Sequence, residues 1–241
     1  MIIQARMTST RLPGKVLKEV LGRPLLGYQI ERLRRVKAAD GVVVATTANE
    51  ADGPIADLCA RLSVPVFRGS EEDVLSRYYF AAREHGAETV VRLTSDCPLI
   101  DPAVVDRVIG FYIERRPDFD YVSNCLQRTY PRGMDTEVFS FKALEQAFNE
   151  AVERHDREHV TPFVYSRPRR FALANVAHGE DLSRYRWTVD TPEDFELIRL
   201  VIETLYPVKP GFAMEDVLAL FEKDKSLFLI NAHVEQKKPG Q

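Results

Sequence analysis

The run Gly41-Val42-Val43-Val44-Ala45-Thr46 places four apolar residues in a row, three of them valines. Such a run, without polar alternation, is typical of a parallel strand covered on both faces. The apolar start Met1–Ala5 precedes it, and a third apolar run, Thr89–Leu93, follows it. Between these runs the apolar residues recur at helical spacing, as Leu25, Leu26, Ile30 and Leu33 do. The pattern therefore predicts three parallel strands joined by helices.

The elements expected on either side continue this alternation over the first 120 residues and become less regular afterwards. We expect further strands at Val64–Arg68, Asp120–Asn124, Glu137–Phe139, Phe171–Val176 and Arg186–Asp190. We expect helices at Pro24–Val36, Pro54–Leu62, Phe141–Val152, Glu158–Tyr165 and, last, Met214–Glu222. Three more helices are expected from their start signals: one from a capping box of Ser70 and Asp73 to about Gly86, one from Asp101-Pro102 onward, and one from Thr191-Pro192 to about Leu205. These elements predict an α/β fold: an open, mostly parallel twisted sheet with helices on both faces and a less regular C-terminal portion. We expect one domain over residues 1–233 and a polar tail over 234–241.

Composition excludes several classes of protein. Hydrophobic residues at 45% and charged residues at 29% are globular values, which argues against a disordered or fibrous chain. A formal net charge of -3 argues against a general nucleic-acid binder. Three widely spaced cysteines form no zinc spacing or disulfide framework, and no run is long enough for a membrane span. We therefore expect a soluble cytoplasmic protein with no nucleic-acid or membrane partner.

Basic residues gather at the N-terminal end of this acidic chain. Between Met1 and Lys37, two acids, Glu19 and Glu31, stand against nine basic residues: Arg6, Arg11, Lys15, Lys18, Arg23, Arg32, Arg34, Arg35 and Lys37. Such an asymmetry suggests an anionic ligand held locally.

The stretch Arg6-Met7-Thr8-Ser9-Thr10-Arg11-Leu12-Pro13-Gly14-Lys15 directly follows the first expected strand. Ligands of open α/β sheets bind at the carboxyl ends of strands. Three cations with hydroxyl groups between them suit a triphosphate, which requires several donors held in advance. The alternative is a solvated basic loop. Neither a P-loop nor the glycine pattern of dinucleotide binders is present.

Two carboxylates follow strand-like segments at the same expected edge of the sheet. Asp96 lies past Thr89–Leu93, and Asp190 ends Arg186–Asp190. A pair of carboxylates delivered by two strand ends suits Mg²⁺, which takes oxygen ligands and keeps several waters. The alternative is that each aspartate caps the helix after it, although Thr191 is an equally good cap. Cys97 has no adjacent histidine to activate it, and we interpret it as a packing residue.

Most of the sequence resembles the acid-sugar cytidylyltransferases, the family of the CMP-sialate and CMP-KDO synthetases. The branch named for spore coat polysaccharide biosynthesis protein F is the most similar. The likeness runs in order through 5–15, 67–78, 92–101, 130–137, 157–162 and 187–194. Thr8 departs from the pattern, because the family usually has Gly there.

This resemblance implies roles for particular residues. Asp96 and Asp190 match the magnesium ligands of the CMP-KDO enzymes, and Arg6 and Lys15 join them as expected catalytic residues. The expected nucleotide-binding residues are Ala5, Arg6, Ser9, Arg11, Lys15, Ala45, Thr46, Arg68, Arg77 and Thr94. Arg68 and Arg77 have an alternative reading as surface ion pairs with Glu71 or Asp73.

Four residues are candidates for binding the sugar: Arg132, Asp135, Glu137 and His159. Arg132 suits a sugar carboxylate, and the two acids would accept hydrogen bonds from hydroxyl groups. The alternative for the cluster around His159 is a helix start with ordinary surface charges.

The function implied is transfer of CMP from CTP to an acidic sugar, with Mg²⁺ as cofactor and pyrophosphate as the other product. The family also suggests a homodimer. Three alternatives stay open: a sugar-1-phosphate nucleotidyltransferase, whose usual glycine-rich loop is absent; a glycosyltransferase of similar fold, whose D-x-D motif is absent; and a non-catalytic nucleotide-binding module.

Overall fold

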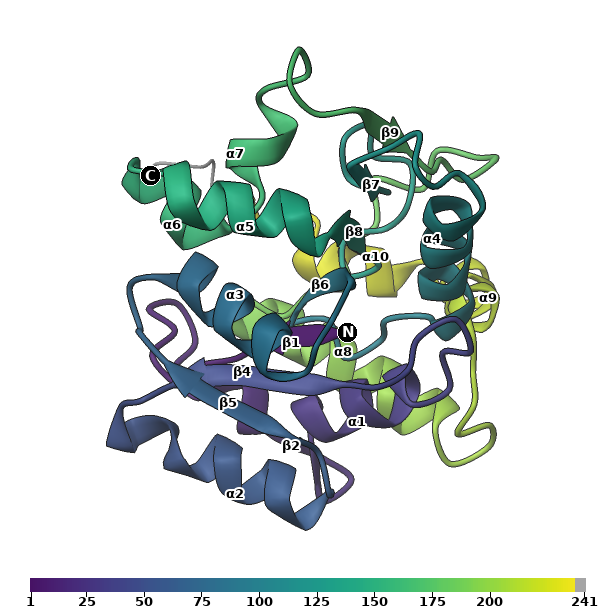
Figure 1. Cartoon of the computed structure of the whole chain (residues 1–241). Helices are drawn as coiled ribbons and strands as arrows, with labels where there is room; N and C mark the ends of the chain where they lie inside the picture. The colour runs from purple at the N-terminus through teal and green to yellow at the C-terminus, as the bar shows by residue number, and fades with distance from the viewer. Residues whose placement is uncertain (237–241) are drawn as a thin grey trace.

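A computed structural model describes residues 1–236 and contains a central sheet of seven strands (Figure 1). The strand order is β5-β4-β1-β6-β8-β7-β9. The strands are β1 (Ile2–Gln4), β4 (Val43–Thr47), β5 (Val66–Gly69), β6 (Thr89–Thr94), β7 (Tyr121–Ser123), β8 (Glu137–Ser140) and β9 (Leu173–Asn175). A separate two-stranded sheet pairs β2 (Glu19–Val20) with β3 (Arg23–Pro24).

Pairing in the central sheet is parallel except along β8. Ile3 of β1 lies opposite Val44 of β4 on one side and Leu93 of β6 on the other, both in parallel register. Strand β8 runs antiparallel to both β6 and β7, and β7 pairs parallel with β9. The predicted open, mostly parallel α/β sheet is confirmed. Because β1, β4 and β6 are parallel neighbours, their carboxyl ends lie at one edge.

Helices cover both faces of the sheet, and a further group of helices packs beyond one of those layers. The helices are α1 (Leu25–Leu33), α2 (Gly53–Arg61), α3 (Val74–Glu84), α4 (Pro102–Glu114), α5 (Phe141–Glu150), α6 (Arg154–His159), α7 (Pro162–Tyr165), α8 (Pro192–Leu205), α9 (Met214–Lys223) and α10 (Ser226–Asn231), with 3-10 turns η1 (Lys15–Leu17) and η2 (Glu50–Asp52). None of the helices in residues 1–236 is long and apolar enough to cross a membrane.

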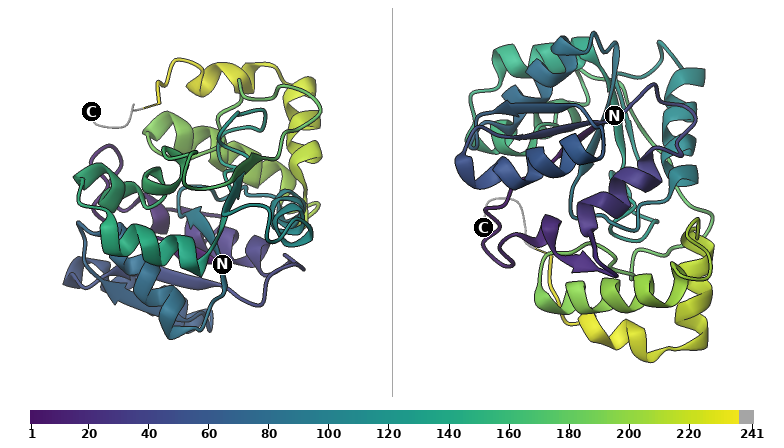
Figure 2. Two further views of the ribbon diagram at one scale, coloured as in Figure 1. Left: turned by 45° about the horizontal axis from the view of Figure 1, so that its top comes forward. Right: turned by 90° about the horizontal axis from the view of Figure 1, so that it is seen from below.

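Three hydrophobic clusters follow from this layering. One cluster packs α1, α2 and α4 against one face of the sheet, and another packs α3 and α5 against the other face. The third joins α8, α9 and α10 to the outer side of α1, through residues such as Leu25, Tyr28 and Trp187. Figure 2 shows these C-terminal helices, green-yellow to yellow, gathered at one side of the molecule. The less regular C-terminal portion is thus a helical layer next to the main sheet.

Local sequence explains where several helices begin. The Asp101 carboxylate accepts a hydrogen bond from the Ala103 N–H, and Pro102 occupies the first helical position of α4. Thr191 and Asp194 form a reciprocal capping box at α8.

Several predicted elements differ from the structure. Ser70 does not cap α3; Asp73 does, by accepting from the Ser76 N–H, while Ser70 Oγ accepts from the Asp73 N–H. The single helix predicted over Glu158–Tyr165 is wrong. Val160, at φ +72°, and the turn before Pro162 separate α6 from α7.

The strand predicted at Arg186–Asp190 is also wrong. Its N–H groups bond to two different loops, Trp187 N to Arg132 O and Val189 N to Asp96 O, and only Arg186 forms an isolated bridge. The helix Met214–Glu222 is not the last, because α10 follows it. Of the predicted tail 234–241, residues 237–241 lie outside the described residues.

Candidate active site

The loop after β1 is held by its own backbone and by one buried carboxylate. The Gly14 N–H donates to the Met7 carbonyl at 2.9 Å, and Gly14 adopts φ +67°, which an L side chain rarely adopts. The Met7 N–H donates to Asp52 Oδ1 at 2.6 Å, and Asp52 is fully buried. These contacts fix the path of residues 6–15 before any ligand arrives.

The segment that follows β6 meets the segment that precedes α8. The Asp96 carbonyl accepts from the Val189 N–H at 2.8 Å and from Thr188 Oγ1 at 3.2 Å. Two stretches about ninety residues apart in sequence are thereby joined by main-chain contacts at the carboxyl edge of the sheet.

The Lys15 ammonium lies between two carboxylates. Its Nζ is 2.8 Å from Asp190 Oδ1, 3.3 Å from Asp96 Oδ2, and 2.7 Å from the Val189 carbonyl oxygen. The other oxygen of Asp190, Oδ2, is 3.0 Å from an Arg11 nitrogen and 2.8 Å from an Arg186 nitrogen. The structure thus brings together the loop cations Arg11 and Lys15 and both predicted carboxylates.

Charge pairing determines the protonation states here. Burial alone would raise the pKa of Asp96, but the Lys15 ammonium and hydrogen bonds from Thr94 and Cys97 lower it to about 2. Burial alone would lower the pKa of Lys15, and the carboxylates of Asp96 and Asp190 raise it above its usual value. Asp96 is therefore ionised and Lys15 protonated at neutral pH.

The capping alternative does not account for either aspartate. Thr191 caps α8, so Asp190 is free for other contacts, and the helix after Asp96 is capped by Asp101. Burial, followed by the Asp96 charge, raises the pKa of the Cys97 thiol well above its usual range. A thiol kept protonated in this way is a poor nucleophile.

The remaining loop residues lie at the open side of this cluster. The Arg6 side chain is 45% exposed and 3.9 Å from Glu71, while Ser9 Oγ accepts from the Leu12 N–H at 3.4 Å. Thr8, where the family usually has Gly, is not among the described residues with positive φ, so this position needs no left-handed backbone. The Thr8 hydroxyl donates to Glu71 at 2.6 Å.

Buried polar groups surround the end of β4. Ala45 and Thr46 are fully buried, and the Ala45 carbonyl accepts from the buried guanidinium of Arg77 at 3.3 Å. Thr46 Oγ1 and Arg77 Nε have no hydrogen-bond partner in the described structure. Arg68 instead donates to the carbonyls of Thr47 and Asn49. Unlike Arg68, Arg77 is therefore not a surface residue.

A cavity of about 470 Å³ opens beside Thr94 at the end of β6. It is lined by Arg92, Thr94, Tyr121, Cys125, Leu126, Asp135, Glu137, His155, His159, Thr161 and Tyr165. Its acids are already paired: Glu137 with Arg92, and Asp135 with Arg128. Glu137 also accepts from the hydroxyls of Tyr121 and Thr161, both at 2.6 Å. Arg132, the fourth residue predicted to bind the sugar, is not among the lining residues.

Comparison with known proteins identifies the family. The sequence profile of the cytidylyltransferase family matches residues 1–235. This chain belongs to the cytidylyltransferases. It is a CTP-dependent nucleotidyltransferase, as the sequence predicted.

Individual relatives agree with this assignment. The spore coat polysaccharide biosynthesis protein SpsF of Bacillus subtilis is 32% identical over 92% of this chain and 93% of its own. A 3-deoxy-manno-octulosonate cytidylyltransferase of Chlamydia trachomatis is 27% identical over 83% of this chain and 80% of its own. A cytidylyltransferase structure from Leptospira borgpetersenii has a TM-score of 0.91 and 34% identity, and the match covers 98% of this chain and 97% of that one.

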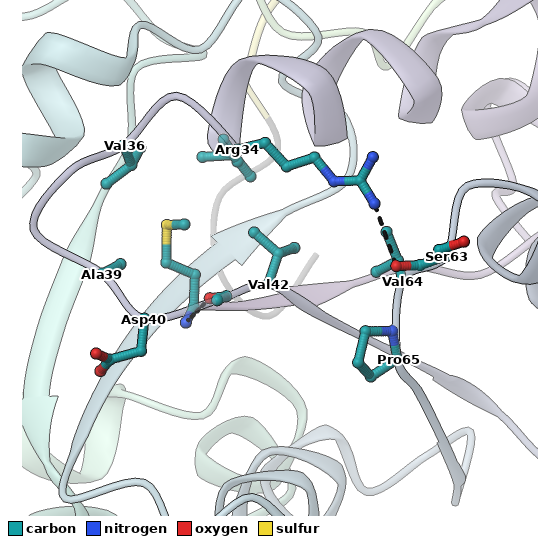
Figure 3. Close-up of a pocket in the computed structure, with 11 residues that line it drawn as sticks. Arg34, Val36, Ala39, Asp40, Val42, Ser63, Val64 and Pro65 are labelled. Carbon is teal, nitrogen blue, oxygen red and sulfur yellow. Dashed lines mark hydrogen bonds between the residues drawn. The ribbon is translucent and has the colours of Figure 1, made fainter.

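A second cavity of the cytidylyltransferase, of about 330 Å³, lies at the opposite edge of the sheet, before β1, β4 and β5 (Figure 3). The Arg34 guanidinium there donates to the carbonyls of Leu62 and Ser63. The Met1 amino group donates to the Gly41 carbonyl at 2.8 Å. Burial lowers the pKa of the Met1 amino group to about 6, and both nitrogen donors are engaged by backbone oxygens.

The sequence did not point to three charged residues that hold the site of this cytidylyltransferase together. Asp52 anchors the loop after β1, Arg92 pairs with Glu137, and Arg186 pairs with Asp190. Arg186 offered one signal, since it lies four residues before Asp190. Asp52 and Arg92 offered none, because their partners are distant in sequence.

Proposed function

We propose that this cytidylyltransferase joins CMP from CTP to a hydroxyl group of an acidic sugar and releases pyrophosphate. The observation that carries the proposal is the Lys15 ammonium between Asp96 and Asp190, next to a basic loop at the carboxyl edge of the sheet. The acidic sugar is supported by the Chlamydia relative, whose name specifies 3-deoxy-manno-octulosonate. The Bacillus relative, named for spore coat polysaccharide biosynthesis, supports a role in surface polysaccharide synthesis.

The loop after β1 would bind the phosphates of CTP. A sugar hydroxyl attacks the α-phosphorus of CTP, and the bond from this phosphorus to the pyrophosphate oxygen breaks. Arg6, Arg11 and Lys15 carry the positive charge that would stabilise the leaving pyrophosphate, and Ser9 adds a hydroxyl donor. Because the loop is already held by Asp52 and Gly14, little reorganisation would be needed during the reaction.

The donor set of the two aspartates fits Mg²⁺. Asp96 and Asp190 both reach one ammonium, so a cation between them would find two carboxylate oxygens, and phosphates and water would complete its shell. Residues 1–236 contain no group of three or more His, Cys, Asp or Glu that would hold a metal by itself. Mg²⁺ bound there would supply charge neutralisation at the phosphate oxygens.

The base and sugar would occupy opposite sides of β1. Ala45, Thr46 and Arg77 at the end of β4 suit the cytosine, since Thr46 Oγ1 and Arg77 Nε are buried polar atoms without protein partners. The cavity at the end of β6 suits the sugar, with Thr94 at its border and Asp135, Glu137 and His159 in its wall. Arg132 remains a candidate only for a substrate that extends beyond this cavity.

We further propose that the enzyme is a cytoplasmic homodimer.

Pyrophosphate release tests the proposal. The enzyme would be assayed with Mg²⁺ and each of CTP, ATP, GTP and UTP, across acidic sugars, neutral sugars and sugar-1-phosphates. We expect release only with CTP and an acidic sugar. Release with a sugar-1-phosphate would move the enzyme to that class of nucleotidyltransferase, and CTP binding without any release would favour a non-catalytic module.

The Asp96→Ala variant tests the site itself. We expect a loss of kcat of about 100-fold or more, because charge stabilisation at the phosphates supplies most of the catalysis. Asp57→Ala is the control, since Asp57 is an exposed acid on α2. Near-normal turnover of Asp96→Ala would contradict the assignment.

A further inference from the structure

A buried carboxylate behind the active site collects more hydrogen bonds than a helix cap requires. Asp194 is fully buried and accepts from the N–H groups of Asp190 and Thr191 at 2.9 and 3.1 Å. It also accepts from Arg186 Nε and Nη2 at 2.8 and 2.9 Å, and from Asn231 Nδ2 at 2.8 Å. The bond from Thr191 suffices for the capping box, so the contacts with Arg186 and Asn231 need another explanation.

These contacts form a chain that ends on an active-site oxygen. Asn231 of α10 bonds to Asp194 and also donates to the Arg186 carbonyl at 2.9 Å. Arg186, held by Asp194, donates through Nη2 to Asp190 Oδ2 at 2.8 Å. The opposite oxygen, Oδ1, is the one that contacts Lys15. Hydrogen bonds thus link the Asp190 carboxylate to α10 of the C-terminal helical layer, in addition to its contacts with Lys15 and Arg11.

Charge explains why Arg186 needs a partner of its own. Without another anion, the Arg186 guanidinium would be free to bond to both oxygens of Asp190. Neither oxygen would then face the proposed Mg²⁺ site. The Asp194 carboxylate engages the guanidinium on Nε and Nη2, and Gln236 Oε1 accepts from Nη1 at 2.6 Å, so Asp190 receives a single hydrogen bond. Partners of this kind fix the orientation of metal-binding carboxylates in other proteins.

We propose that Asp194 and Asn231 are positioning residues for Asp190, and that they act through Arg186 and, for Asp194, also through its bond from the Asp190 N–H. This inference rests on the proposed role of Asp190 as a ligand of Mg²⁺ and phosphate. It assigns to α10 a part in the reaction, although the described residues show no hydrogen bond from its side chains to the loop that would bind the triphosphate.

The test uses Asn231→Leu and Asp194→Asn in the full chain, with Mn²⁺ as the metal probe. We expect the Kd for Mn²⁺ in the presence of CTP, measured by electron paramagnetic resonance, to rise about 10- to 100-fold. We expect kcat to fall by a similar factor, while KM for CTP stays within about twofold, because the base and the basic loop are untouched. Should Asn231→Leu fail to fold, Asn231→Ser retains a donor and is expected to show a smaller rise in the same Kd.

Asp101→Asn is the matched control. Asp101 is likewise a buried carboxylate that caps a helix and bonds to a later helix, through the Ala103 and Met214 N–H groups, but it contacts no active-site residue. We expect this control to lower Tm and leave Mn²⁺ binding and kcat unchanged. Equal losses in the control, or normal Mn²⁺ binding in folded Asn231→Leu, would overturn the inference. Full activity of Asp190→Asn would instead refute the proposed function.

Discussion

Lys15 is the residue on which the charge balance of the site depends. In Lys15→Met the stem is retained but the ammonium is lost, so Asp96 loses its cation, Asp190 keeps only Arg11 and Arg186, and the leaving group loses a donor. We expect kcat for pyrophosphate release to fall about 100-fold or more. Lys18→Met is the control, since Lys18 lies three residues away over the Phe195 ring, 5.3 Å from its centroid. Equal turnover of both variants would contradict this role for Lys15.

His159, in the wall of the cavity at the end of β6, makes the stability of the fold depend on pH. Burial, together with His155 and Arg92, lowers the pKa of His159 below 6.5, although Glu158 and Glu137 oppose the shift. The folded state therefore resists protonation, and the unfolded state takes up the proton first as pH falls. The contribution of neutral His159 to the free energy of unfolding is therefore present above about pH 6.5 and is lost as the pH falls. We expect the free energy of unfolding, measured by urea titration from pH 8 to 5, to fall less steeply in His159→Gln. Parallel curves for the two proteins would contradict this.

In strand β8, the Glu137 carboxylate joins the sheet to the wall of the cavity at the end of β6. Glu137 pairs with Arg92 of β6, its direct antiparallel neighbour, and accepts from Tyr121 of β7. Glu137→Gln would leave the Arg92 charge buried without an anion. We expect a loss of about 3 kcal/mol in the free energy of unfolding, measured by denaturant titration.

The control for this element is the exposed pair of Glu150 and Arg170, which links the end of α5 to a turn. Glu150→Gln is expected to change stability little, because exposed pairs are screened by solvent. A loss in Glu137→Gln no larger than in Glu150→Gln would mean that the Arg92 charge is solvated.

The elements also show what the sequence determines. The valine run of β4 and the Pro102 start of α4 were predictable, because burial on both faces and helix capping act locally. The strand predicted at Arg186–Asp190 was wrong, because its alternating residues bond to the loops at Asp96 and Arg132 instead of to a neighbouring strand. Asp96 and Lys15 were predicted as site residues from their place after strands, and the structure brings them together. Asn231 was not, since its role depends on a contact with Asp194, 37 residues away.

On the scale of the whole molecule, the active site lies where separate hydrophobic clusters meet. The basic loop follows β1, which packs in the clusters of the main sheet, whereas Val189 packs with α8 to α10 in the third cluster. The contacts between them at this edge include Lys15 with Asp190 and the Asp96 carbonyl with the Val189 N–H. A bound nucleotide that touches Lys15, Arg11 and the end of β4 would add contacts across this junction.

CTP should therefore stabilise the whole fold in one transition. With Mg²⁺ and CTP at about 100 times Kd, mass action adds about 2.7 kcal/mol. For a chain of this size the increase corresponds to a rise in Tm of roughly 5–10 °C, measured by differential scanning calorimetry. ATP and GTP at equal concentration should raise Tm much less, because we expect the unpartnered polar atoms of Thr46 and Arg77 at the end of β4 to select cytosine. Lys15→Met should reduce the CTP shift, while Lys18→Met should keep it. A shift of equal size with all nucleotides would mean that the protein holds the triphosphate and does not read the base.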